Sequence, residues 1–267
     1  MIASLHDLSS GVLFVVVVLA TVLVAVGGYV LVRPAVQRLL AEEDASDRVE
    51  YVGTFVQAVG TLYGLIVGLV AVSVWSEYKD AQSLTSREAS AIAAFYRDVS
   101  ALQDPVRTDL RKRTEAYVAY TIDHAWPAQR RGENPVESNV LLRNLGIRLQ
   151  AYEPTSPGQI NLHAEALAKL NDLLEYRRQR VELIEATLEP EMWLVVGIGT
   201  LAIIVLSWLM PSRSLRLHLV LEVLLGIFLG LALFVFVAFD RPLYGDLSVD
   251  ARPYEIVRDR VIGGDPP

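Results

Sequence analysis

The sequence contains no cysteine among its 267 residues. Disulfides, thiolate nucleophiles, iron–sulfur clusters and cysteine-based zinc sites are therefore excluded. The four histidines are scattered without the spacing of a metal site. A glycine-rich phosphate loop, a G-x-S-x-G elbow and an H-E-x-x-H helix are also missing. We therefore expect that the protein is not an enzyme and holds no cofactor.

An excess of positive charge is missing as well. The formal net charge is −7, which argues against a nucleic-acid partner because such proteins attract phosphate with a basic surface. No lysine or arginine precedes the first apolar block, so this block lacks the basic start of a signal peptide. We expect the block to be a retained membrane span.

Long apolar runs are what the sequence does contain. Apolar residues make up 52 % of the chain and gather into four blocks separated by charged stretches. A helix of about 20 residues crosses the hydrocarbon core of a bilayer, and lipid requires that its backbone be hydrogen-bonded internally. The predicted spans are Gly11–Val32, Val52–Trp75, Met192–Met210 and Leu217–Phe239.

The sequence therefore predicts an all-α integral membrane protein with a helical extramembrane domain inserted between spans 2 and 3. The expected division is residues 1–75 for transmembrane helices 1 and 2, 76–191 for the domain, 192–239 for transmembrane helices 3 and 4, and 240–267 for a C-terminal tail. The second helix should continue beyond Trp75 to Leu102, since neither Gly nor Pro occurs between these two residues. Asp104-Pro105 and Ser156-Pro157 are typical helix starts, and the second of these helices should reach Leu188.

Two basic clusters lie in this domain, Arg111-Lys112-Arg113 and Arg177-Arg178-Gln179-Arg180. Charged runs on helices are most often solvated faces, and we interpret both clusters in this way. A site for a lipid headgroup or another anion is the alternative.

One side of the second span is polar. At about 100° per residue, six residues fall within an arc of about 80° and form what we call the polar stripe: Glu50, Thr54, Gln57, Thr61, Gly64 and Gly68. Together with Gly60, the stripe can be a small-residue ridge for close helix packing. Alternatively, several copies surround a water-filled path, with Glu50 near its mouth favouring cations. Both interpretations hide the stripe from lipid.

The fourth span contains an acidic residue, Glu222. An ionisable group inside a membrane is costly and is a functional candidate by default, so we add Glu222 to the candidate ion pathway. Gly226 and Gly230 follow on the same helix face. The alternative is a place at the membrane interface, where Glu222 pairs with Arg213 or Arg216.

Several short segments resemble a known family. They are Gly60-Thr-Leu-Tyr63-Gly64, Val74-Trp75-Ser-Glu-Tyr78, Phe95-Tyr96-Arg97, His124-Ala125-Trp126-Pro127 and, after the last span, Asp240-Arg241-Pro242. Together they resemble the bacterial bestrophin-like family of four-span membrane proteins, although Leu243 stands where that family usually has Phe. Independently of the family, Asp240, Arg241 and Pro242 fit a span terminator, with Arg241 at the interface and Pro242 ending the helix.

The resemblance implies a multi-pass protein of the bacterial inner (plasma) membrane. It also favours an oligomeric channel, because bestrophins are oligomeric anion channels. The basic residues after the first span predict that the first and third loops face the cytoplasm. The large domain then lies outside the cytoplasm.

We therefore predict an oligomeric ion channel with the second span lining the path, cation-preferring if Glu50 is at the mouth. Its expected partners are the lipid bilayer, further copies of the chain and inorganic ions, with no nucleic acid. The alternative is a non-transporting membrane sensor or scaffold whose helical domain binds a partner or ligand.

Overall fold

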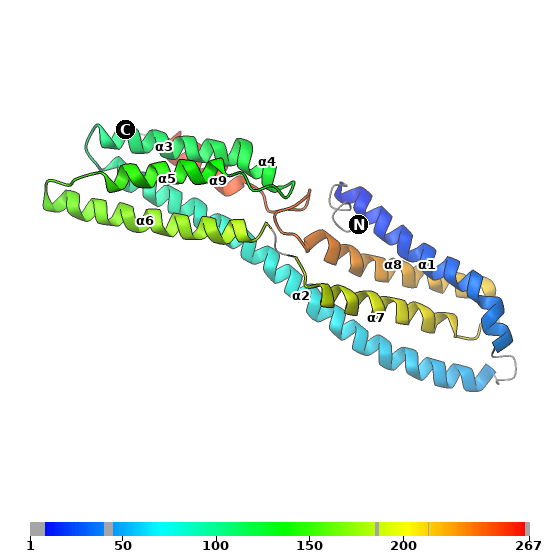
Figure 1. Ribbon diagram of the computed structural model, residues 1–267. Helices are drawn as coiled ribbons and strands as arrows, with labels where there is room; N and C mark the ends of the chain where they lie inside the picture. The colour runs from blue at the N-terminus through cyan, green and yellow to red at the C-terminus, as the bar shows by residue number, and fades with distance from the viewer. Residues whose placement is uncertain (1–8, 40–44, 185–186, 213, 265–267) are drawn as a thin grey trace. The chain divides into compact units, whose positions relative to one another are not determined.

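The computed structural model describes residues 9–39, 45–184, 187–212 and 214–264. All regular structure in these ranges is helical (Figure 1). Four of the described helices are long and apolar enough to cross a membrane: α1 Ser10–Leu39, α2 Ala45–Ser100, α7 Pro190–Trp208 and α8 Leu215–Phe239. The predicted fold class is confirmed, with a helical segment between the second and third spans.

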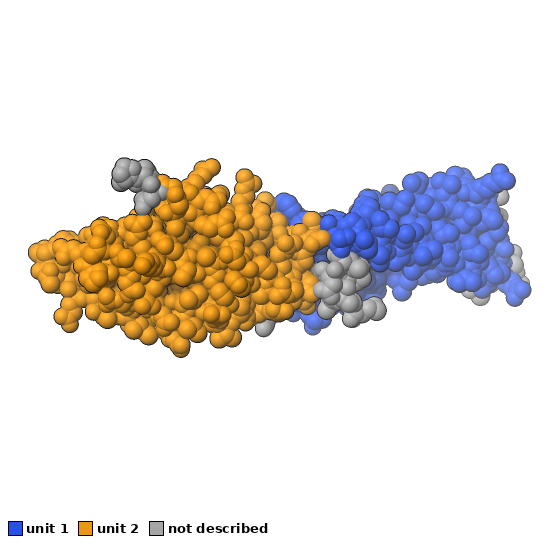
Figure 2. Space-filling model, turned by 90° about the horizontal axis from the view of Figure 1, so that it is seen from above, with its two compact units in different colours: residues 1–76, 187–240 blue, residues 77–186, 241–267 orange. Residues whose placement is uncertain are grey.

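The chain divides into two compact units, coloured separately in Figure 2. Unit 1 comprises Met1–Ser76 and Thr187–Asp240, and unit 2 comprises Glu77–Ala186 and Arg241–Pro267. Helix α2 contributes to both units because no glycine or proline interrupts it between Gly68 and Ser100. The sequence had predicted this long continuation. Helix α1 also runs further than its predicted span. It continues past Val32 to Leu39 and includes Pro34.

Unit 1 is held together by close helix packing. Helices α1 and α8 lie side by side (Figure 1), and glycines on α8 permit this approach. A Cβ atom added to Gly226 would stand 2.7 Å from Cα of Val22, and one added to Gly230 would stand 2.8 Å from Cα of Val18. Small residues at four-residue spacing therefore bring these two backbones together.

Aromatic side chains join the other helices of unit 1. The Tyr63 hydroxyl on α2 donates to the carbonyl of Val196 on α7 at 3.2 Å and lies 2.6 Å from Oγ1 of Thr200. The Trp208 indole on α7 donates to the carbonyl of Ala25 on α1 at 2.9 Å. These bonds satisfy polar groups that would otherwise face apolar surroundings.

Unit 2 packs helices around a larger apolar core. Its elements, besides the end of α2, are α3 Val106–Tyr120, a π-helical turn Thr121–Ala125, α4 Trp126–Gln129, α5 Glu137–Gln150, α6 Pro157–Glu182, α9 Arg252–Ile256 and a second π-helical turn Val257–Ile262. The carboxyl-terminal segment is part of this core, because Leu243, Val249 and Tyr254 are buried in it.

The helix starts of unit 2 follow the sequence in part. Ser156 caps α6 as expected, with its hydroxyl accepting from the Gln159 amide at 3.3 Å. Asp104 does not cap α3, which begins at Val106, and its carboxylate instead accepts from the Thr108 hydroxyl at 2.6 Å. Helix α6 ends at Glu182, earlier than the predicted Leu188.

Candidate functional site

The polar stripe lies on an exposed side of α2. Its side chains are exposed in the single chain from Glu50 to Gly68. The hydroxyl of Thr54 donates to the carbonyl of Glu50, and that of Thr61 donates to the carbonyl of Gln57, both at 2.7 Å. The threonines thus satisfy their donors within their own helix, and each leaves an oxygen available as an acceptor.

The stripe faces away from the helices of its own unit. The side of α2 that packs on α7 carries Tyr63, Val70 and Val74, which are buried. The centre of the stripe is roughly 140° from this side at 100° per residue. A third side, with Phe55, Leu62 and Leu69, is apolar and exposed. Helix α2 therefore has a packed side, a side suited to lipid and a polar side that the described residues leave uncovered.

The glycines of the stripe have no close neighbour among the described residues of unit 1. A Cβ atom added to Gly64 or Gly68 would meet nothing within 4 Å, and one on Gly60 would meet only Cδ1 of Ile203 at 3.8 Å. A packing role for this ridge therefore requires a partner outside the described chain.

Glu222 lies elsewhere in unit 1. It is buried between helices rather than exposed beside the stripe, and its Oε1 is 3.2 Å from Nε2 of His218. The ring of Tyr29 on α1 stacks on His218 with 3.9 Å between centroids. The structure thus does not bring Glu222 together with the stripe. Of the two arginines considered as its partners, Arg216 is exposed and Arg213 lies outside the described residues.

Asp240, directly after the last span, connects two segments of unit 1. Helix α8 ends at Phe239, and Asp240 is 3 % exposed. Its Oδ1 accepts from the backbone N–H of Leu188 at 2.6 Å. This carboxylate therefore ties the end of α8 to the chain that enters α7. In unit 2, the guanidinium carbon of Arg241 lies 5.7 Å from the ring centroid of Tyr244, and Pro242 is buried.

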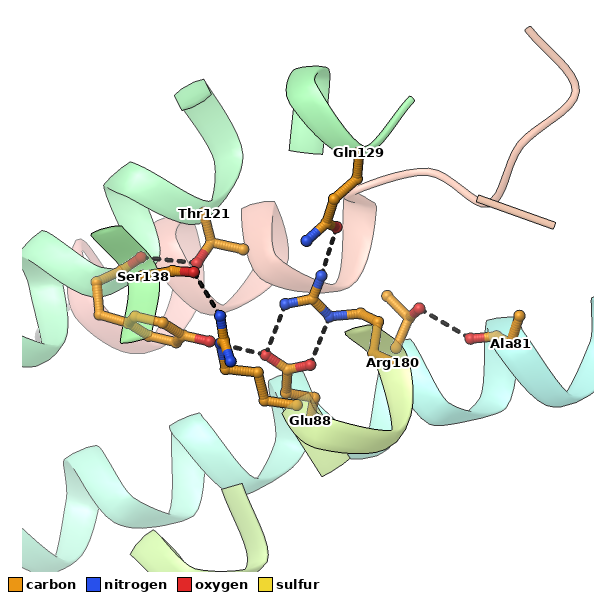
Figure 3. A network of polar contacts seen from close by, with 9 residues as sticks. Ala81, Glu88, Thr121, Gln129, Ser138 and Arg180 are labelled. Carbon is orange, nitrogen blue, oxygen red and sulfur yellow. Dashed lines mark hydrogen bonds and ion pairs between the residues drawn. The ribbon is translucent and has the colours of Figure 1, made fainter. Parts of the chain in front are cut away.

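A buried polar network lies in the core of unit 2 (Figure 3). Arg180 on α6 and Glu88 on α2 are 1 % and 0 % exposed, and they form a bidentate pair with Nε–Oε2 and Nη2–Oε1 distances of 2.6 and 3.2 Å. Arg180 also donates to the side-chain oxygen of Gln129. The Tyr117 hydroxyl donates to Glu88 at 2.9 Å. Bidentate geometry and further hydrogen bonds are what make such a buried pair tolerable.

Aromatic rings surround the guanidinium of Arg180. Its central carbon lies 5.2 Å from the Trp126 ring and 5.8 Å from the Tyr254 ring. Burial raises the pKa of the Tyr117 hydroxyl and that of Tyr254. Burial alone would lower the pKa of Arg180, but the charge of Glu88 outweighs it and the pKa is raised. Arg180 therefore keeps its positive charge despite its burial.

This network corrects one interpretation of the sequence. Arg177 and Arg180 are buried rather than solvated, whereas Arg178 is exposed and paired with Glu175 and Glu182. In the other cluster, Lys112 is exposed but Nε of Arg111 donates to the Tyr96 hydroxyl at 2.9 Å. Spacing could have revealed the buried arginines, since Ala166, Leu170, Leu173, Arg177, Arg180 and Ile184 repeat at intervals of three and four.

The described residues do not gather the ligands of a metal ion. Within the ranges that the structure describes, no group of three or more His, Asp or Glu side chains is placed to hold a metal ion. The chemistry that the uncovered stripe offers is the coordination or hydration of small solutes by carboxylate, amide and hydroxyl oxygens.

Comparisons with known proteins agree on one architecture. A family model described as the bestrophin-like domain matches residues 9–254. Two crystal structures of mutants of a bacterial bestrophin homologue from Klebsiella pneumoniae are similar at 12 % identity. The first has a TM-score of 0.65, covering 94 % of this chain and 99 % of that chain. The second has a TM-score of 0.67, covering 92 % and 98 %. No curated protein matches the chain.

Proposed function

The chain belongs to the bestrophin-like family, and from that premise we propose that it is an oligomeric ion channel whose path is lined by the polar stripe of α2. The observation that carries the proposal is the uncovered stripe. A bilayer cannot solvate a carboxylate, an amide and backbone exposed at glycines. Copies of the chain arranged around an axis would cover the stripe and enclose water beside it.

The charge of the stripe gives the proposed selectivity. Glu50 is exposed near the start of α2, at the end of the membrane-spanning part. In a symmetric oligomer it would form a ring of carboxylates, and such rings favour cations. We therefore propose a cation preference, although bestrophins as a family are known for anions.

Flux through reconstituted liposomes tests this proposal. Purified protein should pass monovalent cations faster than chloride. Glu50→Gln should move the reversal potential in a salt gradient toward zero, because it removes the charged ring. Gln57→Leu should lower the flux, because it replaces a polar lining with an apolar one.

The matched control is Phe55→Leu, on the exposed apolar side of the same helix, which should leave flux and selectivity unchanged. Liposomes that stay tight to every ion under every gradient, with the protein shown to be folded and inserted, would rule the channel out.

The second candidate function is a membrane sensor or scaffold. It is favoured by a groove of about 340 Å³ between α5 and α6 in unit 2, lined by Arg143, Leu174 and Arg177 among others. This function predicts that stripe variants change the oligomeric state, measured by light scattering in detergent, while no variant and no condition yields flux.

We also propose that unit 2 lies outside the cytoplasm, on the strength of the arginines that follow the first span. Because the chain has no cysteine, single cysteines can report orientation. Asn134→Cys, in an exposed loop of unit 2, should react with an impermeant maleimide in spheroplasts, whereas Ser46→Cys should react only after lysis. The reverse pattern would invert the topology.

A further inference from the structure

A histidine and a glutamate are enclosed together inside unit 1. His218 and Glu222 are one turn apart on α8, and they are 5 % and 2 % exposed. Their nearest polar atoms, Nε2 and Oε1, are 3.2 Å apart. The second carboxylate oxygen of Glu222, Oε2, and Nε2 of His218 are both enclosed, and neither makes a hydrogen bond in the described part of the chain. An orphaned buried carboxylate oxygen inside a span needs an explanation.

The neighbouring helices supply few compensating groups. From α1, Tyr29 covers the imidazole and Arg33 is the charge that acts on His218. From α7, Ser207 faces Glu222. The Ser207 hydroxyl donates to the carbonyl of Ile204 at 2.6 Å, so its proton is engaged within α7.

The charge balance of the pair then depends on one proton. Without it the pair is a buried anion, and with a second proton it is a buried cation. Either net charge is costly in apolar surroundings. When one of the two side chains holds a single proton, the pair is neutral overall. We propose that His218 and Glu222 form a proton-binding site within the membrane helices of each protomer, which retains one proton in the folded protein.

The unpartnered oxygen of Glu222 indicates where the proton rests. A buried carboxylate needs hydrogen-bond donors at both oxygens, and Oε2 makes no hydrogen bond in the described part of the chain. A protonated carboxyl group carries no charge that would need such a donor. The proton therefore rests on Glu222, and the neutral imidazole stacks on Tyr29.

The site is placed to act on the contact between two helices. Gly226 and Gly230, where α1 and α8 approach most closely, follow Glu222 at four-residue spacing on the same face of α8. A charge at Glu222 would have to draw in water or a counter-ion, which the close contact leaves no room for. Loss of the proton is therefore expected to loosen α1 from α8, independently of the polar stripe on α2.

Proton binding to this site should make the stability of the folded protein depend on pH in a characteristic way. Free glutamate and histidine side chains titrate near pH 4.3 and pH 6.5, about two pH units apart. Between these values the unfolded chain also holds one proton on the two groups. Above about pH 6.5 it releases that proton while the folded pair keeps its own, and below about pH 4.3 it takes up a second. The stability due to the pair should therefore peak at about pH 5–6 and fall on both sides.

The experiment compares the wild type with the variant His218→Gln/Glu222→Gln by thermal unfolding in detergent from about pH 4 to about pH 9. The ratio of the folding equilibrium constants of wild type and variant, plotted against pH, should be bell-shaped. It should fall by up to tenfold per pH unit above about pH 7. The control is Glu191→Gln, exposed in the first turn of α7, which should give no bell. A difference that is constant with pH, or that vanishes when choline replaces sodium, would overturn the proposal.

A second measurement needs no destabilised variant. The infrared spectrum of the wild-type protein at neutral pH should contain the C=O band of a protonated carboxylic acid, which persists after exchange into sodium-free buffer. Glu222→Gln should remove this band, whereas Glu191→Gln should retain it. A neutral-pH spectrum without a protonated carboxyl band would refute the assignment.

Discussion

At the scale of single residues, charged side chains of unit 2 form ion pairs in two environments, the buried core and the surface. In unit 2, Glu88 and Arg180 are fully buried and form a bidentate ion pair with further hydrogen bonds. At the surface, Arg178 forms pairs of the ordinary solvated kind. The same short stretch of α6 therefore carries one arginine that the core depends on and one that it does not.

This contrast predicts unequal effects of the same substitution. Arg180→Met leaves Glu88 buried without its cation and should lower the free energy of unfolding by about 3–5 kcal/mol. Arg178→Met removes only an exposed pair and should cost at most about 1 kcal/mol. Thermal unfolding of the purified variants measures both. Equal melting temperatures for the two would contradict the proposed importance of the buried pair.

Asp109 gives a residue-scale prediction about pH. Partial burial would raise the pKa of its carboxyl group, but hydrogen bonds from Arg148 and Arg113 hold that pKa below its usual value. A group with a lowered folded pKa adds stability above its unfolded value, near pH 3.9, and loses it as the pH falls further. Asp109→Asn should therefore destabilise the protein at about pH 7 and make little difference in strong acid.

The measurement is the melting temperature of Asp109→Asn against wild type at neutral and acidic pH. Asp80→Asn, at an exposed position of α2, is the control. If the gap for Asp109→Asn stayed as large in acid as at neutrality, the ion pairs would not be its cause.

At the scale of elements, the contact between α1 and α8 has little tolerance. Gly226→Ala would place a methyl group 2.7 Å from a backbone atom of Val22, so the helices must separate, at a cost of about 1–3 kcal/mol. Gly27→Ala, on α1, meets nothing within 4 Å and should be neutral or slightly stabilising, because alanine favours helix. Melting temperatures in detergent that fell equally for both would show that the contact is looser than described.

The elements also show what the sequence could predict. Spans were predictable because each is an uninterrupted apolar run, and the length of α2 was predictable because nothing in it stops a helix. The start of α3 was not, because Asp104 can accept from Thr108 as readily as from a backbone amide. The partners of Glu222 were missed for a related reason: sequence suggested a nearby arginine, whereas the fold brought His218 from one turn away.

At the scale of the whole molecule, the composition of unit 2 was the least predictable feature. Residues after the fourth span were expected to form a tail, yet Leu243, Val249 and Tyr254 are in the core of this unit. The Trp126 indole donates to the carbonyl of Val249 at 3.1 Å, and Arg130 donates to that of Gly245. Contacts between segments more than a hundred residues apart leave no local pattern from which they could be predicted.

The late position of these residues in the chain has a consequence for biogenesis. A ribosome must synthesise all four spans before it reaches Tyr254, so Trp126 and Arg180 lack the contact with this ring until then. Unit 2 can complete its core only after the fourth span has been synthesised. A nascent chain that stalls before this point would display an unfinished apolar surface, which chaperones and proteases recognise.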